Sequence, residues 1–257
     1  MMRRTLLHLV PCAFLLAMPL PLSAQDAMRL VDEMRAARDS DGFEIRMDVD
    51  TTSPDGARGE QIKLALIGDG SARRRRLLIR ALAPEHLRGD SLVAMALDGR
   101  VDARARAANA AAASAVDPAR ALFGSALVAW DVLTPWWDWT DQAIGGREAV
   151  NGHACVDIRS RAPRADAGPV REVVSCVDAE QALAWRTRLL DGRGRELRTI
   201  VVVRAMRTQA GRSVARSAVI DAADGSVTRL EVYAGDEHHS IAPGTFSNVF
   251  QPESSGP

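Results

Sequence analysis

Residues 236–239, with the sequence Asp-Glu-His-His, form the densest group of potential metal ligands in this chain. Carboxylates and imidazoles bind zinc, but neighbouring residues of a strand point to opposite faces, so this group cannot all converge on one ion. A solvated loop is the simpler interpretation. His86 and His153 each stand alone beside a turn, where a surface or hydrogen-bonded histidine is the usual outcome. We therefore expect no metal ion and no cofactor.

Three carboxylates, Asp131, Asp138 and Asp141, lie close enough in the sequence to suggest an acid and base pair. On helical spacing, however, Asp138 and Asp141 form an ordinary solvated edge. The sequence contains no GxSxG elbow, no phosphate-binding P-loop and no HExxH pair, which removes the strongest signatures of nucleophilic and metal-dependent hydrolysis. We predict that the protein has no catalytic residues and is not an enzyme.

Cys155 and Cys176 lie in alternating segments on either side of the turn-rich run APRADAGP, a pattern typical of a β-hairpin. In a symmetric register Cys155 faces Cys176 and Arg159 faces Glu172, which places the thiols on the more polar face of the hairpin. An even pair of cysteines favours a disulfide in an exported protein. Zinc binding or redox chemistry is the alternative, but there is no CxxC pair and no further ligand at metal spacing.

Four of the five tryptophans, Trp130, Trp136, Trp137 and Trp139, fall within ten residues. Aromatic residues make up only 4% of the chain, so this is an unusual concentration of large apolar surface. Nearly helical spacing places Trp130 and Trp137 on one face and turns Trp136 and Trp139 toward a rim or solvent. The window is interpreted either as a helix pair packed in the core or as one wall of a lipid cavity.

The formal net charge is zero, which implies no nucleic-acid partner. Lys63 is the only lysine, and every other basic side chain apart from histidine is arginine. The arginine runs at 73–76 and 100–106 could attract phosphate or lipid headgroups, but acidic residues throughout the chain dilute them. We interpret both runs mainly as solvated surface.

The N-terminal residues have the features of a secretory signal: a short positive segment, an apolar run from Thr5 to Leu20 and small residues before Gln25. The apolar run is shorter than a membrane-spanning helix requires, so we expect cleavage after Ala24 and export to the periplasm. The expected organisation is a cleaved signal peptide at 1–24, a single domain at 25–251 and a disordered tail at 252–257.

Asp26 can cap a short amphipathic helix that ends near 39–42. Alternating segments follow one another without intervening helices, which predicts an antiparallel meander. Residues 101–120 are rich in Ala and Arg and are expected to form a flexible loop or a weak helix. Asp117-Pro118 can start one short helix, and Thr134-Pro135 can cap another with proline at its first position. Further strands follow from the cysteine hairpin onward and can complete a single sheet.

Several segments together resemble the bacterial outer-membrane lipoprotein-sorting family, the LolA-type periplasmic carriers and their relatives. The resemblance covers the chain from Phe43 to Phe250. It rests on RALAPEHLRGDSL at 80–92, LFGS at 122–125 with Asp131-Val132-Leu133, GGREAVNGHACVDI at 145–158, Asp191-Gly192 to Arg195, Gly225 with Thr228, Leu230 and Val232, and Ile241 with Phe246. One segment departs from the family, because relatives often carry a strand rich in Trp, Tyr and Pro where this chain has residues 101–120.

The resemblance implies a mainly β (α+β) protein with a half-open antiparallel β-barrel, and short helices that lid its concave side. It also implies a periplasmic carrier that shields the acyl chains of a lipid or lipoprotein cargo and exchanges it with partners at the inner and outer membranes. A sensor or regulatory binding module on the same fold is the alternative, and an enzyme that uses the barrel as a substrate cup is a third hypothesis. We expect a monomer.

From strand parity and helical face, we predict a set of apolar residues that line the cavity. They are Leu64, Leu66, Leu78, Met95, Leu127, Trp130, Leu133, Trp137 and Trp185.

Overall fold

The computed structural model describes residues 24–71, 74–163 and 168–246. The predicted signal peptide, apart from Ala24, lies outside the described residues, as do the tail at 252–257 and Phe250. None of the described helices is long and apolar enough to cross a membrane.

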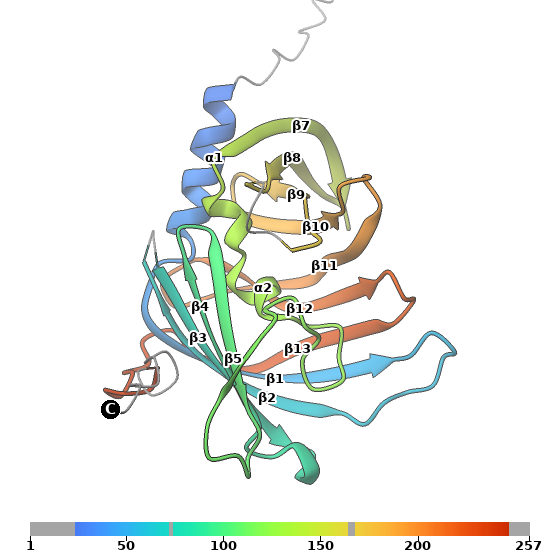
Figure 1. Ribbon diagram of the computed structural model, residues 1–257. Helices are drawn as coiled ribbons and strands as arrows, with labels where there is room; N and C mark the ends of the chain where they lie inside the picture. Colours follow the sequence, from blue (N-terminus) through green and yellow to red (C-terminus); the bar gives the residue numbers. More distant parts are fainter. Residues whose placement is uncertain (1–23, 72–73, 164–167, 247–257) are drawn as a thin grey trace, which may run out of the picture.

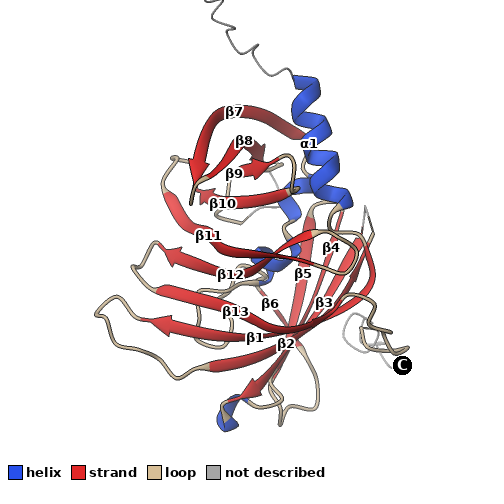
Figure 2. Ribbon diagram, turned by 180° about the vertical axis from the view of Figure 1, so that it is seen from behind, coloured by secondary structure: helices blue, strands red, loops and turns tan. Residues whose placement is uncertain are grey.

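One antiparallel sheet of 13 strands makes up most of the described chain, in the order β6-β5-β4-β3-β2-β1-β13-β12-β11-β10-β9-β8-β7. The sheet curls so that one face is concave, but it does not close, because β6 and β7 remain as its two edges (Figures 1 and 2). The predicted half-open antiparallel barrel is therefore confirmed. The first seven strands and helices after the N-terminus are α1 (Ala24–Ala36), β1 (Ser40–Thr52), β2 (Ile62–Gly70), β3 (Arg74–Ala83), the 3-10 helix η1 (Glu85–Leu87), β4 (Ser91–Leu97) and β5 (Arg100–Arg106).

The C-terminal half of the chain returns to the sheet, so that β1 pairs with β13 at its middle. The remaining elements are β6 (Ser114–Val116), α2 (Ala129–Leu133), the 3-10 helix η2 (Pro135–Asp138), β7 (Asp141–Val150), β8 (His153–Arg161), β9 (Glu172–Asp178), β10 (Leu183–Leu190), β11 (Glu196–Arg207), β12 (Ser213–Ala222) and β13 (Val227–Asp236).

The predicted N-terminal helix is confirmed as α1. Its apolar positions at three- and four-residue spacing become a buried stripe that includes Leu30 and Val31, with 2% and 0% of their surface exposed. The helix packs against the edge strand β7 and against η2, and so holds this edge of the sheet against the segment that contains η2.

Residues 101–120 differ from the prediction of a flexible loop or weak helix. They contain β5 and β6, and no helix begins at Asp117-Pro118. In β5 the small apolar residues alternate with charged ones, so that Ala103 is buried while Arg104 is half-buried and Arg106 is exposed. Period-2 alternation outweighs the high helix propensity of alanine here, because the strand pairs with β4.

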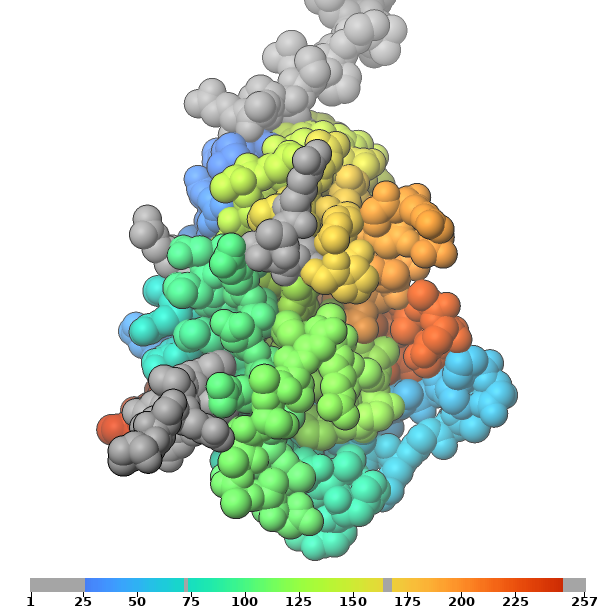
Figure 3. All heavy atoms as spheres, in the orientation of Figure 1, coloured from blue at the N-terminus to red at the C-terminus, as the bar shows by residue number. Residues whose placement is uncertain are grey.

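After β6 the chain crosses the concave face of the sheet (Figure 1). The green segment that leads from β5 to α2 covers the front of the concave face in the space-filling view (Figure 3). Leu122 and Leu127 are buried against the inner strands, and the backbone N–H of Ala126 donates to Thr228 Oγ1 of β13 over 2.8 Å. Residues 117–138, which include α2 and η2, therefore form a lid segment over the middle of the half-barrel.

The cysteine hairpin is confirmed as β8 and β9, but the predicted register is wrong by two residues. Asp157 rather than Cys155 lies opposite Cys176, and Arg161 rather than Arg159 lies opposite Glu172. An even shift keeps every side chain on its face, so the disulfide forms diagonally with a Cα–Cα distance of 5.3 Å.

Candidate functional site

The tryptophan window is core, not the wall of a cavity. Trp130, Trp136, Trp137 and Trp139 are 4%, 2%, 2% and 2% exposed, so the prediction that Trp136 and Trp139 face a rim or solvent is wrong. They pack in one apolar cluster with α1 and with buried residues of β8, β9 and β10. Solid packing of all four against this cluster removes the local argument for a tryptophan-lined groove.

The helical spacing fails because the chain turns sharply after α2. Thr134 adopts a left-handed conformation with φ 44° and ψ 55°, and the following turn is the 3-10 helix η2, with Pro135 at its first position as predicted. The turn redirects Trp136 inward. Trp139 is also held inside, since its Nε1 donates to the carbonyl oxygen of Gly99 over 3.3 Å.

The predicted lining residues fall into three groups. Leu64, Leu66, Leu127 and Leu133 belong to the apolar cluster on the concave face of the sheet. Trp130 and Trp137 belong to the cluster beneath α1. Leu78, Met95 and Trp185 lie outside both of these clusters.

Leu78 and Met95 lie on the outer face of the sheet, because side chains alternate along β3 and β4 and the residues next to these two face inward. Leu77 and Ile79 face the concave cluster, while Leu78 packs with Val93 and Phe246 on the other side of the sheet. Returning chain covers that outer side, so apolar residues occur on both faces and parity alone cannot distinguish them.

Trp185 is displaced by an irregularity in its strand. The register of β10 against β9 shifts between Ala184 and Arg186, and Trp185 packs beside the disulfide, with its ring stacked on His153 at 3.6 Å. A bulge of this kind resets the alternation of side chains. Of the predicted residues, Leu133 alone lines the cavity described next.

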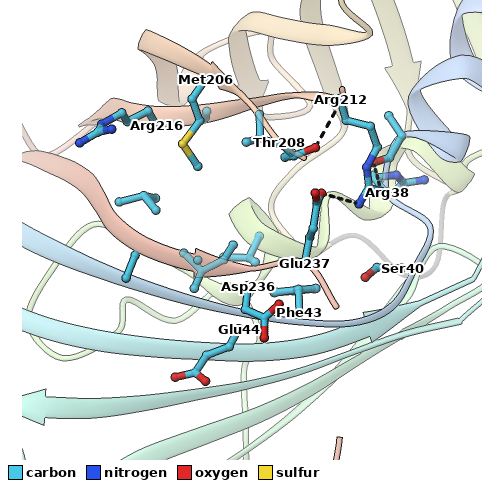
Figure 4. A pocket seen from close by; sticks show the side chains of 18 of the residues that line it. Arg38, Ser40, Phe43, Glu44, Met206, Thr208, Arg212, Arg216, Asp236 and Glu237 are labelled. Atoms are coloured by element: carbon cyan, nitrogen blue, oxygen red, sulfur yellow. Dashed lines mark hydrogen bonds and ion pairs between the residues drawn. The ribbon is translucent and has the colours of Figure 1, made fainter. Parts of the chain in front are cut away.

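A cavity of about 770 Å³ opens between the sheet and the ends of α1 and α2. Its walls come from the first residues of β1 and β3, the hairpin between β11 and β12 and the last residues of β13. Figure 4 shows Met206 and Thr208 on one side, Phe43 and Asp236 on the other, and Arg38 and Arg212 toward one end. The apolar part of the lining includes Phe43, Ile45, Leu77, Leu133, Met206 and Val232.

Buried arginines stand at the α1 end of this cavity. The side chains of Arg38 and Arg75 are 14% and 8% exposed, and both contact the carboxylate of Asp138, whose side chain is 7% exposed. Arg35 approaches the same carboxylate to 3.9 Å. One carboxylate thus serves three guanidinium groups, and burial together with the charge of Arg75 lowers the pKa of Arg38 to about 10.

Oxygen atoms of Leu133 and Thr134 accept further hydrogen bonds from this arginine cluster. Arg75 Nε donates to the Leu133 oxygen over 3.1 Å, and Arg38 Nη1 donates to the Thr134 oxygen over 2.9 Å and to Thr134 Oγ1 over 3.1 Å. The strained turn at Thr134 is therefore fixed by the same side chains that line the cavity.

Solved structures share this architecture. A DUF1329 family protein from Desulfovibrio piger superposes with a TM-score of 0.77 at 14% identity, covering 86% of this chain and 96% of that one. An outer membrane lipoprotein-sorting protein domain from Vibrio parahaemolyticus gives 0.76 at 13% identity over 87% and 97% of the two chains. A LolA superfamily protein from Nitrosomonas europaea gives 0.65 at 15% identity over 88% and 98%.

This chain has the LolA-like fold. The resemblance found in the sequence is thus confirmed at the level of the fold. No family model and no curated protein sequence matches the chain.

Within the LolA-like fold, the arginine cluster is the feature that sequence reasoning missed. Arg75 was assigned to a solvated run and Asp138 to a solvated edge, and both assignments are wrong, since their side chains are only 8% and 7% exposed. Strand parity carried a usable signal: Arg75, Leu77 and Ile79 alternate in β3, so the inner face of the strand begins with the arginine.

The other carboxylate near the lid is structural. Asp131 accepts from the Val128 N–H over 3.0 Å and pairs with Arg198 over 2.8 Å. Burial raises the pKa of Asp131 despite this partner. It caps the first turn of α2 and ties this helix to β11.

Two further groups of side chains carry potential metal-ligand atoms. In the Asp-Glu-His-His run, Glu237 accepts from the Ala210 N–H and His239 Nδ1 lies 3.5 Å from Glu44, so these side chains are directed to different partners. Among the described residues, the one group with converging ligand atoms is Glu148 with Cys155 and Cys176. Those cysteines form the predicted disulfide, which occupies both sulfur atoms.

Proposed function

We propose that this protein is a non-enzymatic periplasmic carrier that shields the acyl chains of a lipid or lipoprotein in the cavity between β1, β13 and α2. The observation that carries the proposal is the cavity of about 770 Å³, which has apolar walls and lies on the concave side of a LolA-like fold. Cavities of this size suit small ligands in general. The secretory signal and the cysteine pair in the sequence support an exported protein.

Burial of hydrocarbon provides the driving force. Each acyl CH₂ removed from water contributes about 0.8 kcal/mol, so a cavity needs only apolar walls to hold a chain. Phe43, Leu77 and Val232 supply such walls, and Met206 adds a flexible side chain that adapts to irregular shapes.

Release of cargo requires a wall that can move. Polar contacts join the lid segment to the sheet at intervals: Ala126 with Thr228, Asp131 with Arg198, and both Leu133 and Asp138 with Arg75. The sheet itself is held by continuous strand pairing. Local opening costs least where fewest contacts must break. We expect α2 to shift when cargo enters.

The proposal is tested by blocking the cavity. Val232→Arg places a cation in the apolar lining, which should weaken binding of a triacylated lipopeptide by about tenfold or more because the guanidinium loses hydration there. Binding is measured by calorimetric titration of purified protein. Native mass spectrometry of protein isolated from the periplasm should also show acylated species.

Val203→Arg is the matched control. Val203 lies in β11, which β12 separates from β13; it is 48% exposed and is not part of the lining, so the same substitution there should leave binding unchanged. The proposal fails if the wild-type protein binds no lipopeptide, or if the two variants bind it equally well.

A further inference from the structure

We infer that the cargo is an amphiphile with an anionic head, a carboxylate or a phosphate, which lies against Arg38 and Arg75 while its acyl chain follows the apolar wall of the cavity. This inference rests on the proposed function and adds the chemical class of the ligand.

The arginine cluster has more positive than negative charge. Within the described part of the chain, Asp138 is the one carboxylate in ion-pair contact with Arg38 or Arg75, and it is shared with Arg35. Arg35 has a second partner in Asp32 at 2.8 Å. Buried charges are normally balanced, so an additional anion beside Arg38 and Arg75 is favoured.

The other acidic groups of the cavity already have partners. Asp69 pairs with Arg76, Glu237 accepts from Arg212 and the Ala210 N–H, Glu44 pairs with Arg46, and Asp236 accepts from the His238 N–H. None of these carboxylates is in ion-pair contact with Arg38 or Arg75 among the described residues. The positive charge is therefore not cancelled from the opposite wall.

The geometry of Arg75 suits recognition of an oxyanion. Its Nε donates to Leu133 and its Nη2 to Asp138, while its Nη1 donates to no described residue. A guanidinium is a planar fork of donors that matches a carboxylate or a phosphate, and at a site with little exposure the attraction is only weakly screened. These features favour an anionic head over a neutral one.

The apolar wall begins immediately beside this cluster. Leu77 is two residues from Arg75 on the same face of β3, and Leu133 supplies both a carbonyl to the arginine and a side chain to the lining. From there Phe43 and Val232 continue along β1 and β13. A head at the arginines and a chain along these residues would use both parts of one cavity.

A ligand series on the wild-type protein tests the inference without relying on any variant. Dodecanoate, dodecyl phosphate and methyl dodecanoate are titrated below their aggregation concentrations. At least one of the two anions should bind about tenfold more tightly than the ester, as expected for a charge-assisted hydrogen bond. The order of the two anions then distinguishes a carboxylate head from a phosphate head.

Two other outcomes separate this inference from the proposed function. Equal binding of all three ligands would overturn the anionic head and leave an acyl-chain cavity. Binding of none of them, together with no binding of lipopeptide, would overturn both.

The variant Arg75→Met tests whether the arginine cluster causes the preference for an anionic head over the ester. The variant keeps Asp138 paired with Arg38 and should bind the ester as the wild type does while losing the preference for the anion. Arg204→Gln is the control, because Arg204 also pairs with a carboxylate, Glu231, but is exposed and lies outside the cavity lining. If Arg75→Met retains the full preference, Arg75 is not the head-group site.

Discussion

Asp138 is the residue on which the α1 end of the cavity depends, because it is the shared partner of Arg35, Arg38 and Arg75. Arg35 belongs to α1, Arg38 to the turn that follows it, and Arg75 to β3, so the carboxylate of Asp138 in η2 joins distant parts of the sequence. Its burial followed from the left-handed turn at Thr134, which helical spacing could not foresee.

The first prediction concerns Asp138→Asn. Removal of the shared carboxylate leaves buried guanidinium groups uncompensated, and breaking a buried pair in this way costs about 3–5 kcal/mol. The free energy of unfolding from urea titration should fall by that amount. Asp69→Asn is the comparison, since the more exposed Asp69–Arg76 pair should contribute at most about 1 kcal/mol. Equal losses in the free energy of unfolding would show that the shared carboxylate contributes no more to stability than a more exposed ion pair does.

At the scale of elements, the sequence predicted best where a pattern repeats without interruption. The stripe of α1, the meander and the cysteine hairpin were all predicted from periodicity, and the disulfide followed from the hairpin. Two predictions of inward-facing residues failed. At Trp185 a register shift in β10 resets the alternation of side chains, and at Leu78 both faces of β3 carry apolar residues, so alternation does not identify the inner one. Such local irregularities depend on packing between segments that are distant in sequence.

The disulfide between β8 and β9 gives the second prediction. It closes a loop with a sequence separation of 21, and in the chain-entropy account a loop of this size contributes about 3 kcal/mol. The double variant Cys155→Ala with Cys176→Ala should therefore lower the urea midpoint clearly while leaving lipopeptide binding unchanged, because the bridge lies outside the cavity. An unchanged midpoint would mean that strand pairing alone determines the stability of this edge.

The third prediction concerns the bracing role of α1. Leu30→Ala removes a side chain that is 2% exposed and packs against the tryptophan cluster, so it should destabilise the protein by about 2–5 kcal/mol. Met28→Ala, at a position 41% exposed on the same helix, should cost far less. Thermal unfolding followed by circular dichroism compares the two, and a similar loss in both would contradict a buried contact between α1 and the lid.

At the scale of the whole molecule, the lid segment covers the concave face of the open sheet unevenly. The tryptophans fill the space beneath α1, whereas the cavity remains open between the start of β1, the end of β13 and α2. The tryptophans therefore support the lid segment, whereas Phe43, Met206 and aliphatic residues form the apolar wall of the cavity. Composition pointed to the tryptophans because they are conspicuous, but cavity walls depend on which strand ends meet, a property of the folded sheet.

The location of the acyl chain is the central claim, and photo-crosslinking tests it most directly. A dodecanoate that carries a diazirine near the end of its chain is bound to the wild-type protein and irradiated, and labelled peptides are mapped by mass spectrometry. The account predicts labels on residues of the cavity wall, such as Met206, Leu133 and Val232. Labelling concentrated instead on residues 136–139 or around Trp185, with the cavity wall unlabelled, would contradict it.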